Sequence, residues 1–205
     1  MSIDELPLAC VGAGGHGKVV ATQWRARKGG EPAFADASAP VGTRVGPFVV
    51  RWKSVREIQH HQLLVTIGDN EARRAVQLEA AALGLPLATL IADEGAYFAA
   101  APGAGSMILA GAVVNTAAVL GEGVIVNSGA IVEHDCEIGS FAHLSPGACV
   151  AGGCKVGEGV WIGANATVIP QLVIAPRTVI GAGSTVVRSI LEPGVYVGTP
   201  ARRIR

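Results

Sequence analysis

The stretch "VIVNSGAIVEHDCEIGSFAHLSPGACV", residues 124–150, repeats one pattern every six residues. An aliphatic residue returns at each sixth position, and the same spacing continues in both directions along the chain. These anchor positions are Ile108, Val114, Leu120, Val126, Val132, Ile138, Leu144, Val150, Val156, Ile162, Val168, Ile174, Ile180 and Val186. A period of six fits neither an α-helix nor the alternation of a single strand. It indicates a solenoid, in which each coil covers the apolar face of its neighbour.

A second column supports this interpretation. The residue four positions after each anchor is small in most repeats. Its members are Ala112, Ala118, Val124, Ala130, Cys136, Ala142, Ala148, Cys154, Val160, Ala166, Leu172, Thr178 and Ser184. Small side chains are expected where the interior of a solenoid narrows. A glycine directly after several anchors, as in "LG" and "IG", predicts a tight corner there.

Composition limits the class of protein. The 205 residues are 50% hydrophobic and 16% charged, which argues against general disorder and allows one large or two small domains. The 16 basic residues balance 16 acidic ones, also within each half, so nucleic acid is not an expected partner. The four cysteines form no CxxC pair, and a disulfide is not expected.

Two features bear on location. The start, "MSIDELPLAC", has no basic segment before an apolar run, so a signal peptide is not expected. Residues 96–121 carry no charge, but Pro102, Asn115 and the short apolar period argue against a membrane span. We therefore expect a cytoplasmic protein without a membrane span.

The first half has a different pattern. "LPLACVGAGGHGKVVATQW", residues 6–24, predicts a strand, a glycine-rich turn and a helix. Its glycines satisfy GxGxxG, which can present a helix N-terminus to a phosphate or simply form a tight turn. Further strands are expected around residues 33–36, 47–52, 61–70 and 86–93, and a helix over 70–84 with Asn70 as its cap.

The combination of motifs resembles a known family. The resemblance rests on six segments, which are distributed over nearly the whole chain: "GAGGHGKVV", "FAD", "TIGDN", "VNSGAIVEHDCEIGSFAHLSPGA", "GVWIGANATVIPQLVI" and "GVYVGTPARRI". The chain resembles the hexapeptide-repeat sugar O-acyltransferases of the sialic acid O-acetyltransferase type. Within them it is most similar to the branch that N-acetylates UDP-linked 4-amino sugars, as in bacillosamine synthesis.

The resemblance implies a fold. A Rossmann-like α/β domain over residues 1–93 would bind a nucleotide sugar, and residues 94–107 would form a linker. A left-handed parallel β-helix with three-faced coils of eighteen residues would span 108–191, followed by a tail over 192–205. The family further implies acetyl-CoA as co-substrate, no metal, and a homotrimer with active sites between subunits.

His134 and Asp135 are the candidate catalytic residues. His134 lies outside the two inward columns, and the resemblance places the catalytic histidine of the family there. The unperturbed pKa of histidine, about 6.5, suits a general base near neutrality. Asp135 would orient the imidazole, although neighbours on a strand point to opposite sides, so this pairing needs a corner. The alternative is a histidine that is merely exposed, with Glu133 and Glu137 as surface charges.

The eighteen-residue coil stacks Gly152 on His134 and Gly153 on Asp135. Two glycines there would leave an open groove for the thioester, with backbone N–H groups available to an oxyanion, or would only form a corner. The residues expected to contact acetyl-CoA are Asn127, His143, Gly152, Gly153, Ala164 and Ala182. Those expected to contact the nucleotide sugar are Gly14, Gly15, His16, Asp36, Gly68 and Asn70.

These residues predict an acetyltransferase in which His134 takes a proton from the sugar amine. O-acetylation of a sugar such as sialic acid would use the same base and stays open. A metal enzyme of the β-helical carbonic anhydrase type is disfavoured, because only His134 and His143 lie in the repeat. A non-catalytic scaffold that binds sugar nucleotides remains a further alternative.

Overall fold

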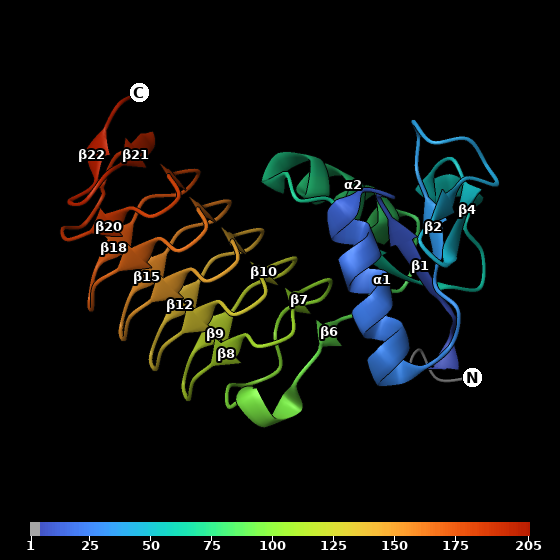
Figure 1. The fold of residues 1–205 in the computed structure, drawn as a ribbon, viewed down its shortest axis with the longest axis horizontal. Helices are drawn as coiled ribbons and strands as arrows, with labels where there is room; N and C mark the ends of the chain where they lie inside the picture. Colours follow the sequence, from blue (N-terminus) through green and yellow to red (C-terminus); the bar gives the residue numbers. More distant parts are fainter. Residues whose placement is uncertain (1–4) are drawn as a thin grey trace. The chain divides into compact units, whose positions relative to one another are not determined.

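The structure, a computed structural model, describes residues 5–205 and divides into two compact units (Figure 1). The first unit ends at Leu90 and the second begins at Ile91. The first is an α/β unit and the second a parallel β-helix, as predicted. Among the described residues, no helix is both long and apolar enough to cross a membrane.

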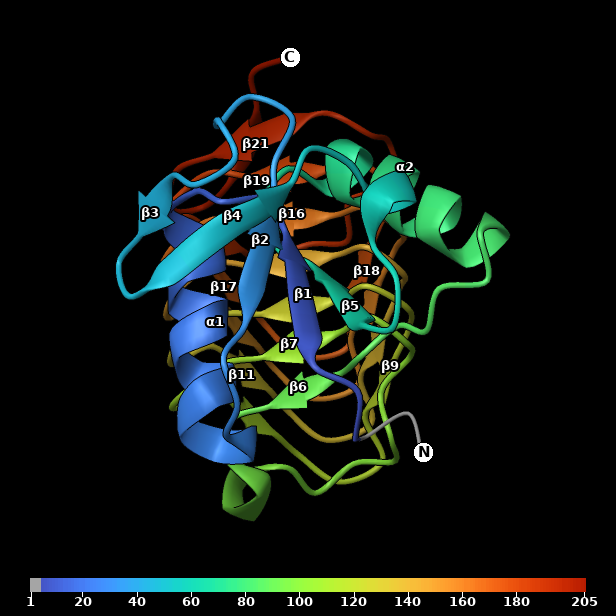
Figure 2. The ribbon, with the colours of Figure 1, turned by 90° about the vertical axis from the view of Figure 1, so that its right-hand side faces the viewer.

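The first unit is built on one five-stranded sheet with the order β3-β4-β2-β1-β5 (Figure 2). The strands are β1 (Leu8–Val11), β2 (Ala33–Ala35), β3 (Arg44–Val45), β4 (Phe48–Trp52) and β5 (Gln62–Val65). β1, β2, β4 and β5 run parallel, and β3 pairs antiparallel with β4. From β1 the chain adds β2 and β4 on one side of the sheet and then β5 on the other side. In parallel sheets of this kind, ligands bind at the carboxyl ends of the strands where the strand order reverses in this way.

Helix α1 (Gly15–Lys28) starts at the predicted glycine turn. Gly14 is its N-cap, and no side chain caps the first turn of the helix at this residue. Gly17 is required for packing, because a Cβ there would overlap the Gly12 carbonyl oxygen. The third glycine of the motif therefore lets the helix lie close against β1.

Helix α2 (Asn70–Ala82) corrects one sequence prediction. The N-cap is Asp69, whose side chain accepts a hydrogen bond from the Ala72 N–H at 2.8 Å. Asp and Asn are about equally good caps, so the sequence could not separate two adjacent candidates. A short 3-10 helix, η2 (Val55–Glu57), precedes β5.

The second unit stacks two-residue strands on three faces, all in parallel register. The first face holds β7 (Met107–Ile108), β10 (Ile125–Val126), β13 (His143–Leu144), β16 (Trp161–Ile162) and β19 (Val179–Ile180). The second holds β8 (Val113–Val114), β11 (Ile131–Val132), β14 (Cys149–Val150), β17 (Thr167–Val168) and β20 (Thr185–Val186). The third holds β9 (Val119–Leu120), β12 (Glu137–Ile138), β15 (Lys155–Val156) and β18 (Val173–Ile174).

The register confirms the eighteen-residue coil. Val132 pairs with Val150, which in turn pairs with Val168, and the other faces repeat this spacing. Every anchor from Ile108 to Val186 is buried in one continuous apolar core. Each corner contains a residue with φ near +60°, as at Asp135 and Gly153, which turns the chain onto the next face.

Both ends of the solenoid are irregular. β6 (Leu90–Ile91), in the segment expected to close the first domain, instead joins the first face beside β7. The stretch expected as a linker contains η3 (Glu94–Ala96) and bonds to the coil, since the Phe98 N–H donates to the Val114 carbonyl. In the tail, β21 (Val195–Val197) pairs with β19, and β22 (Arg202–Arg203) pairs antiparallel with β21.

Candidate active site

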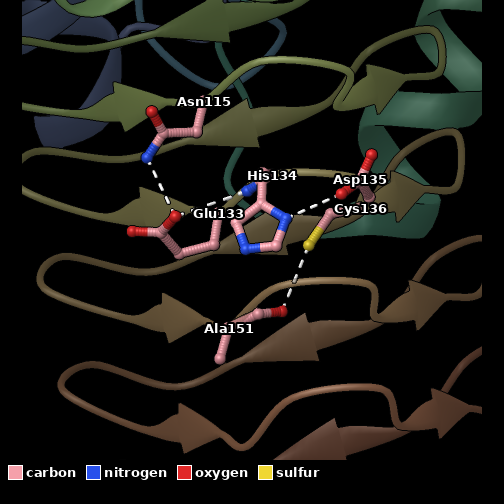
Figure 3. Close-up of polar contacts among 6 residues, drawn as sticks. All are labelled: Asn115, Glu133, His134, Asp135, Cys136 and Ala151. Atoms are coloured by element: carbon pink, nitrogen blue, oxygen red, sulfur yellow. Dashed lines mark hydrogen bonds and ion pairs between the residues drawn. The ribbon is translucent and has the colours of Figure 1, made fainter.

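His134 and Asp135 form the corner between the second and third faces (Figure 3). Asp135 adopts a left-handed conformation with φ of 58°, which brings two consecutive side chains to the same side. Its Oδ2 lies 2.7 Å from His134 Nδ1. The corner that this pairing needs is therefore present.

The pair has the electrostatics of a base and its orienting carboxylate. The hydrogen bond with Asp135 raises the pKa of His134 above its ordinary value, and the charge of Glu133 acts in the same direction. The imidazole remains 59% exposed. When Nδ1 donates its proton to Asp135, Nε2 is the nitrogen that can accept a proton from a ligand.

Glu133 is more than the surface charge that the sequence suggested. Its Oε2 accepts a hydrogen bond from Asn115 Nδ2, one coil earlier, at 3.0 Å (Figure 3). The only signal in the sequence was the eighteen-residue spacing of these two residues. Glu137 points to solvent and forms an ion pair with Lys155 at 2.8 Å.

Gly152 lies against the imidazole, one coil beyond it. A Cβ at this position would sit 2.6 Å from His134 Nε2, so any side chain would displace the ring. A groove of about 410 Å³ opens here. Its walls are His134, Asp135, Gly152, Gly153, Pro170 and Gln171.

One part of the expected oxyanion site is wrong. The Gly153 N–H donates to the His134 carbonyl at 2.9 Å and is therefore not available to a ligand. This bond belongs to the ladder that joins successive corners. Of the two glycines, Gly152 is left as the candidate donor.

His143 occupies a different environment, on the first face. It is only 6% exposed, and its ring stacks on Trp161 with centroids 5.7 Å apart. The Asn127 amide approaches its Nε2 at 3.1 Å. Trp161 Nε1–H donates to Ser145 Oγ at 2.8 Å, so Ser145 joins a group that the sequence did not predict.

The residues expected to contact acetyl-CoA thus fall into two groups within one chain. Gly152 and Gly153 lie beside His134 at the corner after the second face. Asn127, Ala164 and Ala182 lie at the corner after the first face, and His143 lies on the first face itself. A strand of the second face separates the two corners in every coil. The fold of one chain does not bring the groups together.

The residues expected to contact the nucleotide lie at the carboxyl ends of β1, β2 and β5. Gly14, Gly15 and His16 start α1, and Gly68 and Asn70 lead into α2. Burial, together with the charge of Arg73, lowers the pKa of His16 to about 4, so this histidine is neutral at physiological pH.

Arg73 is a buried residue that the sequence did not single out. Its guanidinium donates to the Ile67 and Gly68 carbonyls and to Asn70 Oδ1 at 3.1, 3.2 and 2.8 Å. Burial lowers its pKa to about 10, which leaves it charged near neutrality. Arg73 therefore fixes the loop between β5 and α2 that carries "IGDN".

Asp36 holds the backbone of two neighbouring loops in place. Its carboxylate accepts hydrogen bonds from the N–H groups of Ala13, Ser38 and Ala39. Burial opposes its ionisation, but these bonds and one from the Ser38 hydroxyl outweigh it and hold the pKa of Asp36 well below its usual range. Asp36 also lines a pocket of about 380 Å³ with Val11, Ile67 and Lys53, whereas Gly14, Gly15, His16, Gly68 and Asn70 do not.

Within the part of the chain that the structure describes, no group of three or more His, Cys, Asp or Glu side chains is arranged to hold a metal ion.

The fold and the site define a hexapeptide-repeat transferase. Residues 153–188 match the family described as bacterial transferase hexapeptide (six repeats), and residues 7–79 match the PglD N-terminal domain. No curated protein sequence matches the chain.

Solved structures extend the match over nearly the whole chain. The acetyltransferase domain of PglB from Neisseria gonorrhoeae FA1090, in complex with acetyl coenzyme A, is 36% identical, covers 97% of this chain and 98% of its own, and has a TM-score of 0.89. PerB from Caulobacter crescentus, in complex with CoA and GDP-perosamine, is 34% identical over 96% of both chains, with a TM-score of 0.85. WeeI from Acinetobacter baumannii AYE, 23% identical over 97% of this chain and 99% of its own, shares the fold with a TM-score of 0.82. The chain belongs to the family of bacterial sugar N-acetyltransferases that join a PglD-type domain to a hexapeptide β-helix, and it is an acetyltransferase.

Proposed function

We propose that the chain transfers the acetyl group of acetyl-CoA to the amino group of a nucleotide-linked 4-amino sugar, with UDP as the nucleotide, in bacterial surface glycan synthesis. We expect it to act in the cytoplasm. The observation that carries the proposal is the His134–Asp135 pair, whose Nε2 faces Gly152 in an open groove. Relatives solved with acetyl coenzyme A, and with CoA and GDP-perosamine, support both classes of substrate.

In this mechanism, His134 acts as general base. Its Nε2 takes the proton that the sugar amine loses as the amine nitrogen bonds to the thioester carbon. The Gly152 N–H donates to the carbonyl oxygen while that oxygen carries negative charge. As the carbon–sulfur bond breaks, His134 passes its proton to the departing thiolate, and Asp135 stabilises the imidazolium in between.

The first unit would hold the nucleotide. The N-terminus of α1, which follows the glycine turn, suits the phosphates, and the pocket beside Asp36 suits the base. Arg73 would keep the "IGDN" loop in place, and neutral His16 would offer a hydrogen bond without adding charge.

A substrate panel tests this function. UDP-, GDP- and dTDP-linked 4-amino sugars are incubated with acetyl-CoA, and thiol release is measured. We expect release with at least one of them and the fastest release with the UDP sugar. A faster reaction with GDP would overturn the choice of nucleotide alone. Release only with free sialic acid would favour O-acetylation, and no release with any acceptor would favour a non-catalytic scaffold.

We further propose a homotrimer whose sites each use two chains. The two groups of predicted acetyl-CoA residues lie at different corners, so a site containing both requires a neighbouring copy. Light scattering measures the oligomer directly. His134→Ala and Asn127→Ala chains, each weakly active alone, should recover activity when refolded together, because about a quarter of randomly mixed sites combine two intact groups. No recovery in confirmed mixed trimers would contradict shared sites.

A further inference from the structure

The thiol of Cys136 lies inside the β-helix, directly behind the catalytic corner. Cys136 is fully buried and follows Asp135 in sequence. Its Sγ donates a hydrogen bond to the Ala151 carbonyl, on the next coil, at 3.2 Å (Figure 3). The surrounding interior consists mainly of aliphatic and small side chains.

The contact fixes the direction of a catalytic N–H. The Ala151 carbonyl and the Gly152 N–H belong to one peptide group, and in a trans peptide they point in opposite directions. Because the carbonyl is directed to the buried Cys136 thiol, the Gly152 N–H is directed outward, where the Gly152 backbone adjoins His134. We propose that Cys136 is a positioning residue, which holds this peptide so that the Gly152 N–H meets the carbonyl oxygen of the acetyl donor.

The inference rests on the proposed function, in which Gly152 supplies the oxyanion donor. The thiol is suited to its part, because burial in the apolar interior disfavours the thiolate form of Cys136. It therefore keeps its proton at neutral pH and remains a donor.

The next coil supplies a matched control. Cys154 is equally buried and donates to the Ile169 carbonyl at the same distance, 3.2 Å. The residue that follows is Pro170, which has no N–H to present. The two thiols thus make the same bond, but only the one from Cys136 orients a donor.

The test compares Cys136→Ala with Cys154→Ala, assayed with acetyl-CoA and the acceptor sugar that the panel selects. Cys136→Ala should lower kcat by about 3- to 10-fold, less than the 10²–10³-fold typical when an oxyanion donor is removed, because the N–H stays but is less well held. The KM for acetyl-CoA and the pH profile should not change, because His134 is untouched. Cys136→Ser, which restores a donor, should recover most of the rate. Cys154→Ala should keep kcat within about twofold.

Several outcomes would overturn the inference. Equal losses in the two alanine variants would show that the thiols serve packing only, and a serine variant no better than alanine would exclude hydrogen bonding. If Cys136→Ala does not fold, Cys136→Val replaces it, since valine stands in the same column at Val124 and Val160. A large loss in Gly152→Ala with none in Cys136→Ala would overturn this inference alone. A wild-type chain that transfers no acetyl group would overturn the proposed function and this inference with it.

Discussion

Two histidines half a coil apart in the same repeat have opposite surroundings. The His134 side chain is 59% exposed, sits at a corner and is paired with a carboxylate. His143 is 6% exposed, sits on a strand, and lies between an amide and an indole ring. His143 is covered by side chains of the neighbouring coils, Asn127 and Trp161. Its position in the six-residue unit does not bury it, because Glu137 holds the same position in another repeat and is exposed. A solenoid can therefore give one residue type two different environments.

Of the substitutions that test the difference between the two histidines, His134→Ala should have the largest effect. Without the base, turnover should fall about 10²- to 10⁴-fold, while coenzyme A still binds with near-normal affinity. Steady-state kinetics and calorimetry with coenzyme A check the two parts separately. Activity within a few fold of wild type would remove His134 from the mechanism.

Gly152→Val tests the space that the exposed histidine needs. The new side chain would overlap the imidazole, turn it away from Asp135 and fill the groove. We expect a loss of turnover on the order of 10²-fold and weaker binding of acetyl-CoA. The melting temperature controls for damage to the coil. Unchanged kinetics in a folded variant would show that thioester and base do not meet beside Gly152.

Asp135→Asn separates orientation from charge. The carboxylate raises the pKa of His134, so the acidic limb of kcat/KM should lie above about 6.5 in the wild type. Below this limb the imidazole is protonated and cannot act as a base, so activity falls as the pH falls. The variant should shift the limb toward about 6.5 and lower kcat about 10-fold. A limb that does not move would mean that Asp135 does not act on His134 in the working enzyme.

His143→Ala should have the smallest effect. Removing the ring leaves Trp161 and Asn127 without their partner, so we expect the KM for acetyl-CoA to rise by about 3- to 10-fold. The acidic limb should keep its position, because it belongs to His134. A shifted limb would instead make His143 the titrating base and reverse the roles of the two histidines.

The sequence predicted the solenoid well because the regular spacing of its buried anchors determines the path of the backbone. The six-residue spacing identified Val132, Val150 and Val168 as anchors, and the eighteen-residue coil implied by the resemblance placed them in register. The stacking of Gly152 on His134 followed from the same spacing. Contacts that depend on rotamers did not follow, as the bond from Asn115 to Glu133 shows.

The first unit was predicted less completely. Its strands and helices were recognised from their apolar runs and glycines, but Arg73 stands in a helix where an arginine normally faces solvent. Only the folded loop reveals three acceptors around its guanidinium. Likewise, Asp69 rather than Asn70 caps α2, because Asp69 is the residue with the extended backbone before the helix. The similar capping preferences of Asp and Asn do not distinguish the two.

The hydrogen bond from the Gly153 N–H to the His134 carbonyl has a mechanical consequence. It joins the backbone of His134, the proposed base, to the backbone directly after Gly152, the proposed oxyanion donor. In the proposed mechanism, the ladder of the coils thus holds these two groups side by side. Heating should therefore remove catalysis and the structure of these coils at one temperature, with no intermediate in which the coils persist but the base has lost its partner.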